Sequence, residues 1–265
     1  MNNFDSTRRT VLRGAAALST LVLAGCDGIS SSPWAVDLLR EVENLTRRAQ
    51  RLFAGGHALA PEYGKADIAA TFRANGTTNP GTNDYAVHMM EQFKNWIIPV
   101  GGLVENPLKL SLADLRKMPS RTQITRHDCV EGWSCIGQWT GTPLQLVLAM
   151  TRPKPEARYA VFYCADTMGE AGIDAAGNPT QPPYYYESLD LLEATHPQTI
   201  LAYELNRAPL PVENGAPVRL RAERQLGYKQ PKYVQRIELV DSFARIGGGR
   251  GGYWEDQDYQ WYGGI

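Results

Sequence analysis

Apolar residues recur at helical spacing over residues 34–53, and charged residues occupy the positions between them. The apolar positions are Val36, Leu39, Val42, Leu45, Ala49, Leu52 and Phe53. A stripe of this kind is typical of an amphipathic helix that packs one face on a protein surface. Gly55 and Gly56 follow directly and predict the end of the helix. We therefore expect one helix here, packed onto the domain that follows it.

Beyond Pro61 the pattern changes to short runs rich in Val, Ile, Thr and Tyr, bounded by Gly, Pro or Asn, which is typical of β-strands. The predicted strands cover residues 96–104, 123–130, 159–165, 199–205, 217–221 and 233–240. Short helices are predicted after the capping box of Ser111 and Asp114, over 143–150 and over 188–195. Strands and helices do not alternate regularly, so the expected fold class is α+β, with mixed sheets and short helices.

The first 25 residues have a different pattern. Thr7-Arg8-Arg9-Thr10-Val11-Leu12 is a twin-arginine start, and the apolar run after it, residues 15–24, is too short to span a bilayer. The run ends in Leu23-Ala24-Gly25-Cys26, which resembles a lipoprotein signal with cleavage before Cys26 and a lipid on that cysteine. An ordinary signal peptide with an incidental cysteine is the alternative.

We therefore expect a signal peptide over residues 1–25, and a lipidated tether with the amphipathic helix over 26–60. Asp27 resembles an inner-membrane retention signal, so the expected location is periplasmic, with the lipid of Cys26 in the inner membrane. The main domain is expected over residues 61–265, a length that suits one large domain. With 27 basic and 28 acidic side chains, the even charge balance gives no sign of a nucleic-acid partner.

If Cys26 carries lipid, Cys129, Cys135 and Cys164 remain. An odd number in an oxidising compartment leaves at least one thiol without an internal disulfide partner. Cys135 and Cys164 could pair with each other and leave Cys129 free, and the sequence does not decide whether they do.

Cys129 lies in the segment Arg126-His-Asp-Cys-Val-Glu-Gly-Trp-Ser-Cys-Ile-Gly-Gln-Trp-Thr-Gly-Thr142. We expect it at the end of an apolar strand, entering a loop that ends at Gly141. Arg126 and His127 are expected to lower the pKa of its thiol, and a thiolate binds a soft metal.

Three other readings of Cys129 are open: a structural cysteine, a Cys–His hydrolase without a visible partner arrangement, and a zinc site. A zinc site from His127, Cys129 and Cys135 has the wrong spacing and lacks a second ligand pair.

Cys129-Val-Glu-Gly-Trp133 followed by Trp139-Thr-Gly-Thr-Pro-Leu144 resembles the signature of the sulfite-oxidase family of molybdopterin enzymes. Within that family it is most similar to the branch of protein-methionine-sulfoxide reductase catalytic subunits. Further segments match in order over roughly residues 70–245, including Pro211-Val-Glu-Asn-Gly-Ala-Pro-Val-Arg-Leu220 and Gly227-Tyr-Lys-Gln-Pro-Lys232. The resemblance implies a sulfite-oxidase-type molybdopterin-binding domain in which Cys129 is the thiolate ligand of molybdenum.

The resemblance also implies the residues that hold the molybdenum–pyranopterin cofactor: Asn75, Cys129, Cys164, Asn214, Arg219, Lys229, Gln230 and Lys232. Arginine offers phosphate a planar fork, lysine a point charge, and asparagine a donor and an acceptor for the ring edge. Cys164 stands where the reductase branch has a threonine, so it either touches the cofactor or pairs with Cys135. True sulfite oxidases have arginine where this chain has Ala74, which argues against sulfite as the substrate.

The implied activity is oxygen-atom transfer on a small S- or N-oxide or an oxyanion. Glu131 is expected to share the side of the strand end with Cys129, as a supporting carboxylate or proton relay; a surface salt bridge is the alternative. Trp133 and Trp139 are expected to pack the walls. No C-x-x-C-H haem motif occurs, so a membrane or c-type cytochrome is expected as electron partner, without haem in this chain. A non-catalytic binding protein that keeps the fold is the rival class.

Gly247, Gly249 and Gly252 satisfy the spacing of a dinucleotide-binding loop, G-x-G-x-x-G. Such a loop needs a strand before it and a helix after it. These glycines lead instead into Tyr253-Trp-Glu-Asp256 near the chain end, so we do not expect a dinucleotide site.

Overall fold

The computed structural model describes residues 32–265 except 56–57, 171 and 174–179. It divides into one unit over Met1–Phe53 and a second over Ala54–Ile265. The predicted signal peptide and Cys26 lie outside the described residues. None of the helices in the described residues has the length and hydropathy of a transmembrane span.

The amphipathic helix is present as α2 (Pro33–Ala54), and Gly55 follows it with a φ of 77°. That left-handed conformation favours glycine and ends the helix as predicted. Several large apolar side chains of α2 are exposed, namely Trp34, Leu38, Val42, Leu45, Leu52 and Phe53. The packing of α2 onto the domain stays a prediction.

The second unit contains ten strands and short helices in its described residues. The strands are β1 (Ile97–Gly102), β2 (Leu108–Ser111), β3 (Arg121–Asp128), β4 (Ser134–Pro143), β5 (Tyr159–Thr167), β6 (Tyr184–Asp190), β7 (Ile200–Leu205), β8 (Ala208–Pro209), β9 (Arg219–Arg221) and β10 (Val234–Val240). The helices are η1 (Lys65–Asp67), α3 (Asn83–Met90), α4 (Leu112–Lys117), α5 (Leu144–Thr151), α6 (Leu191–Ala194), η2 (Val212–Asn214), η3 (Gly227–Lys229) and α7 (Tyr253–Asp256).

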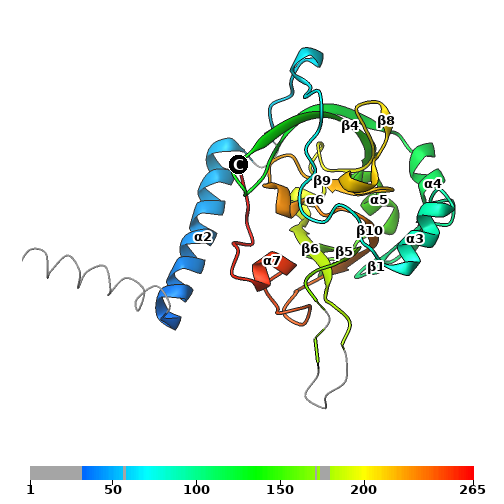
Figure 1. Cartoon of the computed structure of the whole chain (residues 1–265). Coiled ribbons are helices and arrows are strands. Elements are labelled where there is room, and N and C mark those ends of the chain that lie inside the picture. The colour runs from blue at the N-terminus through cyan, green and yellow to red at the C-terminus, as the bar shows by residue number, and fades with distance from the viewer. Residues whose placement is uncertain (1–31, 56–57, 171, 174–179) are drawn as a thin grey trace, which may run out of the picture. The chain divides into compact units, whose positions relative to one another are not determined.

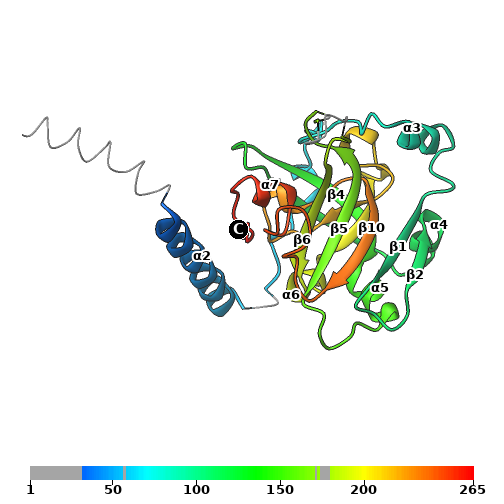
Figure 2. The same cartoon turned by 90° about the horizontal axis from the view of Figure 1, so that it is seen from below.

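The strands form two sheets (Figure 1). One has the order β2-β1-β10-β5-β6, and its β1–β10 pair is parallel while its other pairs are antiparallel. Figure 2 shows β6, β5 and β10 side by side, with β1 and β2 at one edge. The other sheet has the order β3-β4-β7-β8, and β9 pairs with β7. The mixed sheets with few short helices confirm the predicted α+β class.

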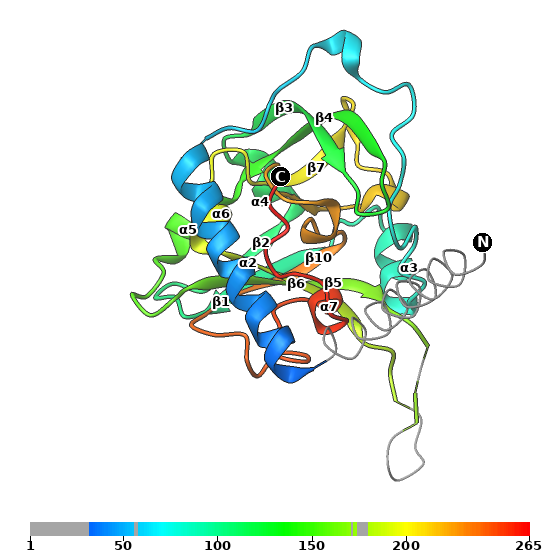
Figure 3. The same ribbon diagram turned by 90° about the vertical axis from the view of Figure 1, so that its left-hand side faces the viewer.

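The main apolar core includes side chains from both sheets, such as Phe162, Ile237 and Leu239 from one and Leu201 and Leu220 from the other. A smaller cluster of Phe72, Cys135, Trp139, Ile200, Ala202, Leu205 and Leu210 belongs to the β3–β4–β7 sheet and the segments that cover it. Figure 3 shows β3, β4 and β7 on one side of this unit and α7 beside β5 and β6 on the other. The turn of the β3–β4 hairpin and the C-terminal segment nevertheless meet, because residues of both line one cavity.

Two predicted elements were wrong. The loop expected to run to Gly141 is strand β4, because Gly137 and Gly141 are strand residues without room for a side chain. A Cβ at Gly141 would lie 2.3 Å from the carbonyl oxygen of Leu201. The helix expected over 188–195 is only the four-residue α6, since β6 continues to Asp190, whose side chain then caps the helix.

The predicted capping box is confirmed. The Ser111 hydroxyl accepts a hydrogen bond from the Asp114 amide at 3.1 Å, and the Asp114 carboxylate accepts one from the Ser111 amide at 3.0 Å. The glycine-rich loop at 247–252 also has a local function. Its amides at Gly248 and Arg250 donate to the Asp256 carboxylate, at 2.7 and 3.1 Å. The loop therefore binds the chain's own carboxylate.

Candidate active site

Cys129 lies in the turn between β3 and β4. The amide of Cys129 donates to the Trp133 carbonyl at 2.9 Å, and the amide of Gly132 donates to the Cys129 carbonyl at 3.0 Å. Gly132 has a φ of 86°, a conformation that costs a side chain strain. Glycine therefore stands in the Cys-Val-Glu-Gly-Trp motif because the hairpin requires it there, and the hairpin in turn exposes the thiol.

The thiol environment differs from the expected one. Burial raises the pKa of the Cys129 thiol and the Glu131 carboxylate raises it further, while backbone amides of the turn and Arg73 act in the opposite direction. Arg126 does not face the thiol, because its guanidinium pairs with Asp128. His127 is buried, and its pKa is lowered first by that burial and then by Arg221 and Arg219. A bound cation, more than these neighbours, would stabilise the thiolate.

A cavity next to Cys129 collects residues from distant parts of the chain. Its lining consists of Asn75, Gly76, Thr77, Cys129, Val130, Glu131, Asp166, Met168, Tyr185, Gly227, Tyr228, Gln230, Pro231, Lys232, Trp254 and Tyr259. Five of the residues predicted from the sequence are among them: Asn75, Cys129, Glu131, Gln230 and Lys232. The fold thus brings the cysteine and part of the predicted cofactor set to one cavity.

Asn214 and Arg219 lie next to this group and are fully buried. The Arg219 guanidinium donates to the carbonyls of Asn214 and Gln230, at 3.0 and 3.1 Å. The Lys232 ammonium donates to the carbonyls of Asn75 at 2.6 Å and Glu213 at 3.0 Å, and also to that of Thr77. Burial lowers the pKa of Arg219 to about 9 and that of Lys232 to about 7.

Gly215 allows these two cations to approach each other. It has a φ of 109°, and a Cβ there would lie 2.8 Å from the Lys232 Cβ and 3.2 Å from the Arg219 Cβ. The result is a concentration of buried positive charge beside the cavity. An anionic group such as a phosphate would offset it.

Several buried polar atoms of this group have no partner among the described residues: Asn75 Oδ1, Asn214 Nδ2, Arg219 Nε and Asp166 Oδ1. A buried donor or acceptor without a partner costs about 1–3 kcal/mol. Two of these atoms accept and two donate, which suits a ligand with a hydrogen-bonding ring edge and an anionic end. Together with the Cys129 thiol, the set fits a molybdenum–pyranopterin, which Asn75, Cys129, Asn214, Arg219, Gln230 and Lys232 would hold.

Lys229 and Cys164 are placed differently from the other predicted cofactor residues. The Lys229 ammonium is buried in an ion-paired cluster with Glu187 and, at 2.6 Å, with Glu255. Its side chain therefore fastens α7 to β6. Cys164 is buried on β5, and burial raises the pKa of its thiol. Their roles toward the cofactor stay predictions.

The structure answers the disulfide question left open by the sequence. Cys129, Cys135 and Cys164 are all free thiols. Cys135 is on β4 and Cys164 is on β5, in different sheets. In the described part of the chain, no three His, Cys, Asp or Glu side chains converge as ligands of a metal ion. A metal here would depend on Cys129 and on sulfur ligands supplied by a cofactor.

Glu131 is in the turn and not on the strand end, because β3 stops at Asp128. Its carboxylate accepts a hydrogen bond from the Trp133 indole at 2.9 Å, at the exposed side of the cavity. The Arg73 guanidinium lies over the Trp133 ring, 4.6 Å from its centroid. The partner of Glu131 in the structure is thus the Trp133 indole, whereas the alternative prediction was a surface salt bridge.

Sequence reasoning missed a buried network behind the cysteine hairpin. Arg221 pairs with Glu223 at 2.6 Å, and both side chains are fully buried. Arg221 also donates to His127 Nδ1 at 2.9 Å, and its guanidinium lies 4.4 Å from the centre of the buried Trp139 ring. Alternation of charged and apolar residues in Arg219-Leu-Arg221 was the available signal, but it is also typical of a half-exposed strand.

Asp166 is the second residue that the sequence did not single out. It follows Cys164 by two positions on β5, lines the cavity and is 4% exposed. Burial raises the pKa of its carboxyl to about 6, although Lys232 and a hydrogen bond with Thr77 act to lower it. The charged form is therefore disfavoured in the folded protein.

We predict that the Asp166→Asn variant changes the pH dependence of stability in protein produced without cofactor. The folded-state pKa, about 6, lies above the ordinary 3.8, so the penalty of the carboxyl grows as pH rises from about 4 to about 6 and stays constant at higher pH. The unfolding free energy of the variant relative to wild type should rise by about 2.5 kcal/mol between pH 4 and pH 8. Urea unfolding at four pH values measures this, and a pH-independent difference would contradict it.

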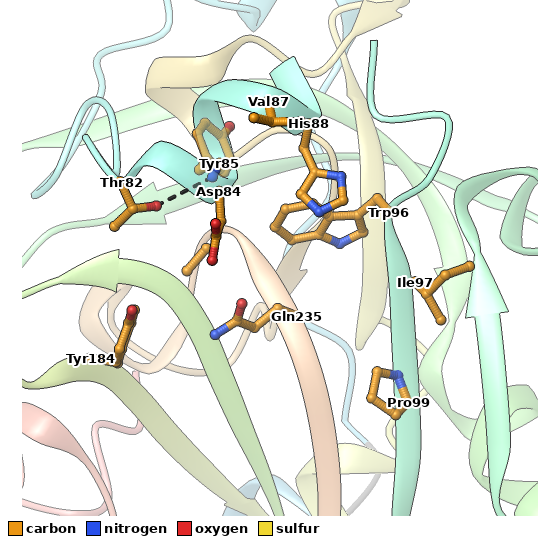
Figure 4. A pocket seen from close by; sticks show the side chains of 11 residues that line it. Thr82, Asp84, Tyr85, Val87, His88, Trp96, Ile97, Pro99, Tyr184 and Gln235 are labelled. Carbon is orange, nitrogen blue, oxygen red and sulfur yellow. Dashed lines mark hydrogen bonds between the residues drawn. The ribbon is translucent and has the colours of Figure 1, made fainter. Parts of the chain in front are cut away.

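A second cavity, of about 460 Å³, lies between α3 and the β1–β10–β5–β6 sheet (Figure 4). His88 lies beside Trp96, with ring centroids 5.1 Å apart, and Tyr184 and Gln235 form the opposite side. None of the predicted site residues lines it. The chemistry of this chain therefore centres on the cavity that contains Cys129.

The comparisons with known proteins agree with this geometry. A family model described as the oxidoreductase molybdopterin binding domain matches residues 85–245. The chain is 33% identical over 261 residues to the protein named "Putative protein-methionine-sulfoxide reductase subunit YedZ1" of Azospira oryzae, covering 97% of this chain and 87% of that protein. It is 34% identical over 256 residues to the protein-methionine-sulfoxide reductase catalytic subunit MsrP of Ralstonia nicotianae, covering 90% and 70%.

Among solved structures, the chain is similar to the sulfane dehydrogenase SoxCD from Paracoccus pantotrophus. The identity is 23% and the TM-score 0.45, over 56% of this chain and 39% of that chain.

A molybdopterin-binding oxidoreductase is thus the class of protein that the domain match and the cysteine-centred cavity define. The chain belongs to the sulfite-oxidase-type family of these enzymes, and relatives that align over most of its length are named as subunits of protein-methionine-sulfoxide reductase. The predicted family and enzyme class are confirmed, and the domain implies a molybdenum–pyranopterin cofactor.

Proposed function

We propose that this enzyme reduces a neutral S-oxide, with N-oxides as a second substrate class, and receives electrons from a separate haem carrier. The observation that carries the proposal is the charge of the cavity lining. Lys232 is the one cation among the described lining residues, and two carboxylates, Glu131 and Asp166, share the cavity with it. The Lys232 ammonium already donates to three carbonyls, so an oxyanion substrate would find few free donors in this lining.

The reaction consumes the sulfoxide, two electrons and two protons, and releases the thioether and water. When bound, the molybdenum–pyranopterin supplies the two-electron oxygen-atom chemistry. Cys129 would provide the thiolate ligand, and Arg219, Asn214 and Asn75 would orient the organic part through polar atoms that have no partner among the described residues. This assignment gives each of those atoms a hydrogen-bond partner.

Two carboxyl groups are placed to deliver protons. Asp166, whose pKa is raised to about 6, holds a proton on a buried oxygen in mildly acidic conditions. Glu131 is exposed to solvent on the same cavity, and we assign it the role of a proton relay to bulk water. In this proposal the buried Asp166 carboxyl donates the proton, and the exposed Glu131 carboxylate resupplies it from solvent.

The proposed location is the periplasm, with export by the twin-arginine signal and a lipid on Cys26. The sequence observations support it: Arg8-Arg9, the apolar run and Leu23-Ala-Gly-Cys26 occur in the order that a lipoprotein signal requires. The Cys26→Ser variant should move from the membrane fraction to the soluble periplasm, whereas Cys135→Ser should stay in the membrane. Retention of the Cys26→Ser variant in the membrane would refute the anchor.

A substrate panel tests the proposed reaction. The purified holoenzyme is assayed with a reduced viologen dye against methionine sulfoxide, dimethyl sulfoxide and trimethylamine N-oxide, and with ferricyanide against sulfite. We expect sulfoxide reduction with kcat/KM at least about 100-fold above sulfite oxidation. Faster oxidation of sulfite would refute the proposal. Haem bound in stoichiometric amounts to the purified chain would refute a separate haem carrier.

A further inference from the structure

The C-terminal segment, residues 241–265, follows the last strand β10 and mostly lies beyond the residues that the family model matches. Two of its side chains, Trp254 and Tyr259, nevertheless line the cavity that contains Cys129. The wall they form is therefore supplied from outside the matched domain.

The segment is firmly attached at the positions around this wall. Glu255 pairs with buried Lys229 at 2.6 Å, and Asp256 accepts the amides of the glycine-rich loop. The Leu226 amide donates to the Gly263 carbonyl at 2.7 Å, and the Ile265 amide donates to the Arg224 carbonyl at 3.0 Å. These bonds hold the two aromatic rings in place before any substrate arrives, which lowers the entropic cost of binding.

The rings form a continuous aromatic surface. Trp254 and Tyr259 stack with centroids 5.2 Å apart, and Tyr259 meets Tyr228 edge to face at 5.4 Å. Tyr259 is 38% exposed, so its ring is available to a ligand. Val130 and Met168 extend the apolar lining. Such a surface binds aryl, alkyl and polarisable sulfur groups.

We infer that Trp254 and Tyr259, the C-terminal aromatic wall, select the substrate by an apolar substituent next to the S-oxide. This inference rests on the proposed function and narrows its substrate class to sulfoxides that carry an aryl or extended thioether side chain. A small sulfoxide such as dimethyl sulfoxide is too short to gain from the wall. The wall acts on substrate affinity, because its two rings offer stacking and apolar contacts.

The test compares methyl p-tolyl sulfoxide with dimethyl sulfoxide in wild type, Trp254→Leu and Tyr259→Leu holoenzymes. Each leucine variant should raise the KM for the aryl sulfoxide about tenfold, with kcat and the kinetics of dimethyl sulfoxide changed less than about twofold. Trp254→Phe keeps a ring and should retain most of the preference. Tyr184→Leu is the matched control, because Tyr184 is also an exposed tyrosine but lies at the second cavity (Figure 4).

An equal loss on both substrates would overturn the inference, and so would a loss of molybdenum from the leucine variants, which would make the wall a cofactor support. Direct binding of the aryl sulfoxide to oxidised holoenzyme, followed by calorimetry, separates this inference from the proposed reaction. Binding that the leucine variants weaken about tenfold, in a wild type that turns over neither sulfoxide, would refute the reaction and keep the wall. Absence of aryl sulfoxide binding to wild type would refute the wall.

Discussion

Replacing Cys129 with serine is expected to lower the oxygen-atom-transfer activity at least about 100-fold and to reduce the molybdenum content of the purified protein. Cys129 is the one described cysteine that lines the cavity, and serine replaces its soft sulfur with a hard oxygen. Cys129→Ala removes the ligand altogether and should lose more molybdenum. Elemental analysis gives the metal content, and viologen-linked turnover of methionine sulfoxide gives the activity.

The other two described cysteines provide the matched controls. Cys135 is buried in the small cluster with Phe72 and Trp139, so Cys135→Ser should keep its molybdenum and most of its activity. Cys164→Ser tests whether that thiol touches the cofactor. Cys164 lies on β5 two residues before Asp166, which lines the cavity. A normal molybdenum content and normal activity in Cys129→Ser would refute the assignment of Cys129 as the metal ligand.

The second large effect is expected on stability. Arg221→Met should lower the free energy of unfolding by about 3–5 kcal/mol, because it leaves the Glu223 carboxylate buried without its cation. Among the described residues, Glu223 would keep the Gln123 amide, which donates to it at 2.8 Å. Urea unfolding at pH 7.5, with ellipticity and fluorescence as two probes, measures the loss.

Arg236→Met is a matched control for this effect. Arg236 pairs with Glu238 at 2.7 Å with the same spacing along the chain, but the two side chains are 46% and 31% exposed. Its loss should cost less than about 1 kcal/mol. The double variant Arg221→Met with Glu223→Leu should be more stable than Arg221→Met alone, since neither charge of the pair remains buried. Equal effects at the buried and exposed pairs would show that the network does not stabilise the fold.

Local features of the site were predictable from sequence. The sequence predicted Cys129 at the end of a strand that passes into a loop, and in the structure β3 ends at Asp128, directly before a turn in which Gly132 adopts the left-handed conformation. The capping box at Ser111 is equally local, since its two hydrogen bonds join residues three apart. The loop predicted to Gly141 was wrong because strand glycines are identified only by the backbone that approaches them, here Leu201.

The sequence by itself determined the family, and it predicted the cysteine that would hold the metal and the order of the cofactor segments, because these depend on short motifs and their spacing. Only the tertiary structure decided which side chains meet. Lys232 bonds to a carbonyl 157 residues away, at Asn75, and Asp166 and Trp254 enter the cavity from a strand and a C-terminal segment that no motif marks. The shifted pKa values of Lys232 and Asp166 follow from burial and from neighbouring charges, which are properties of the folded surroundings. The thiol of Cys129 illustrates both: its position follows from the motif, and its raised pKa follows from the burial and the Glu131 charge that the fold provides.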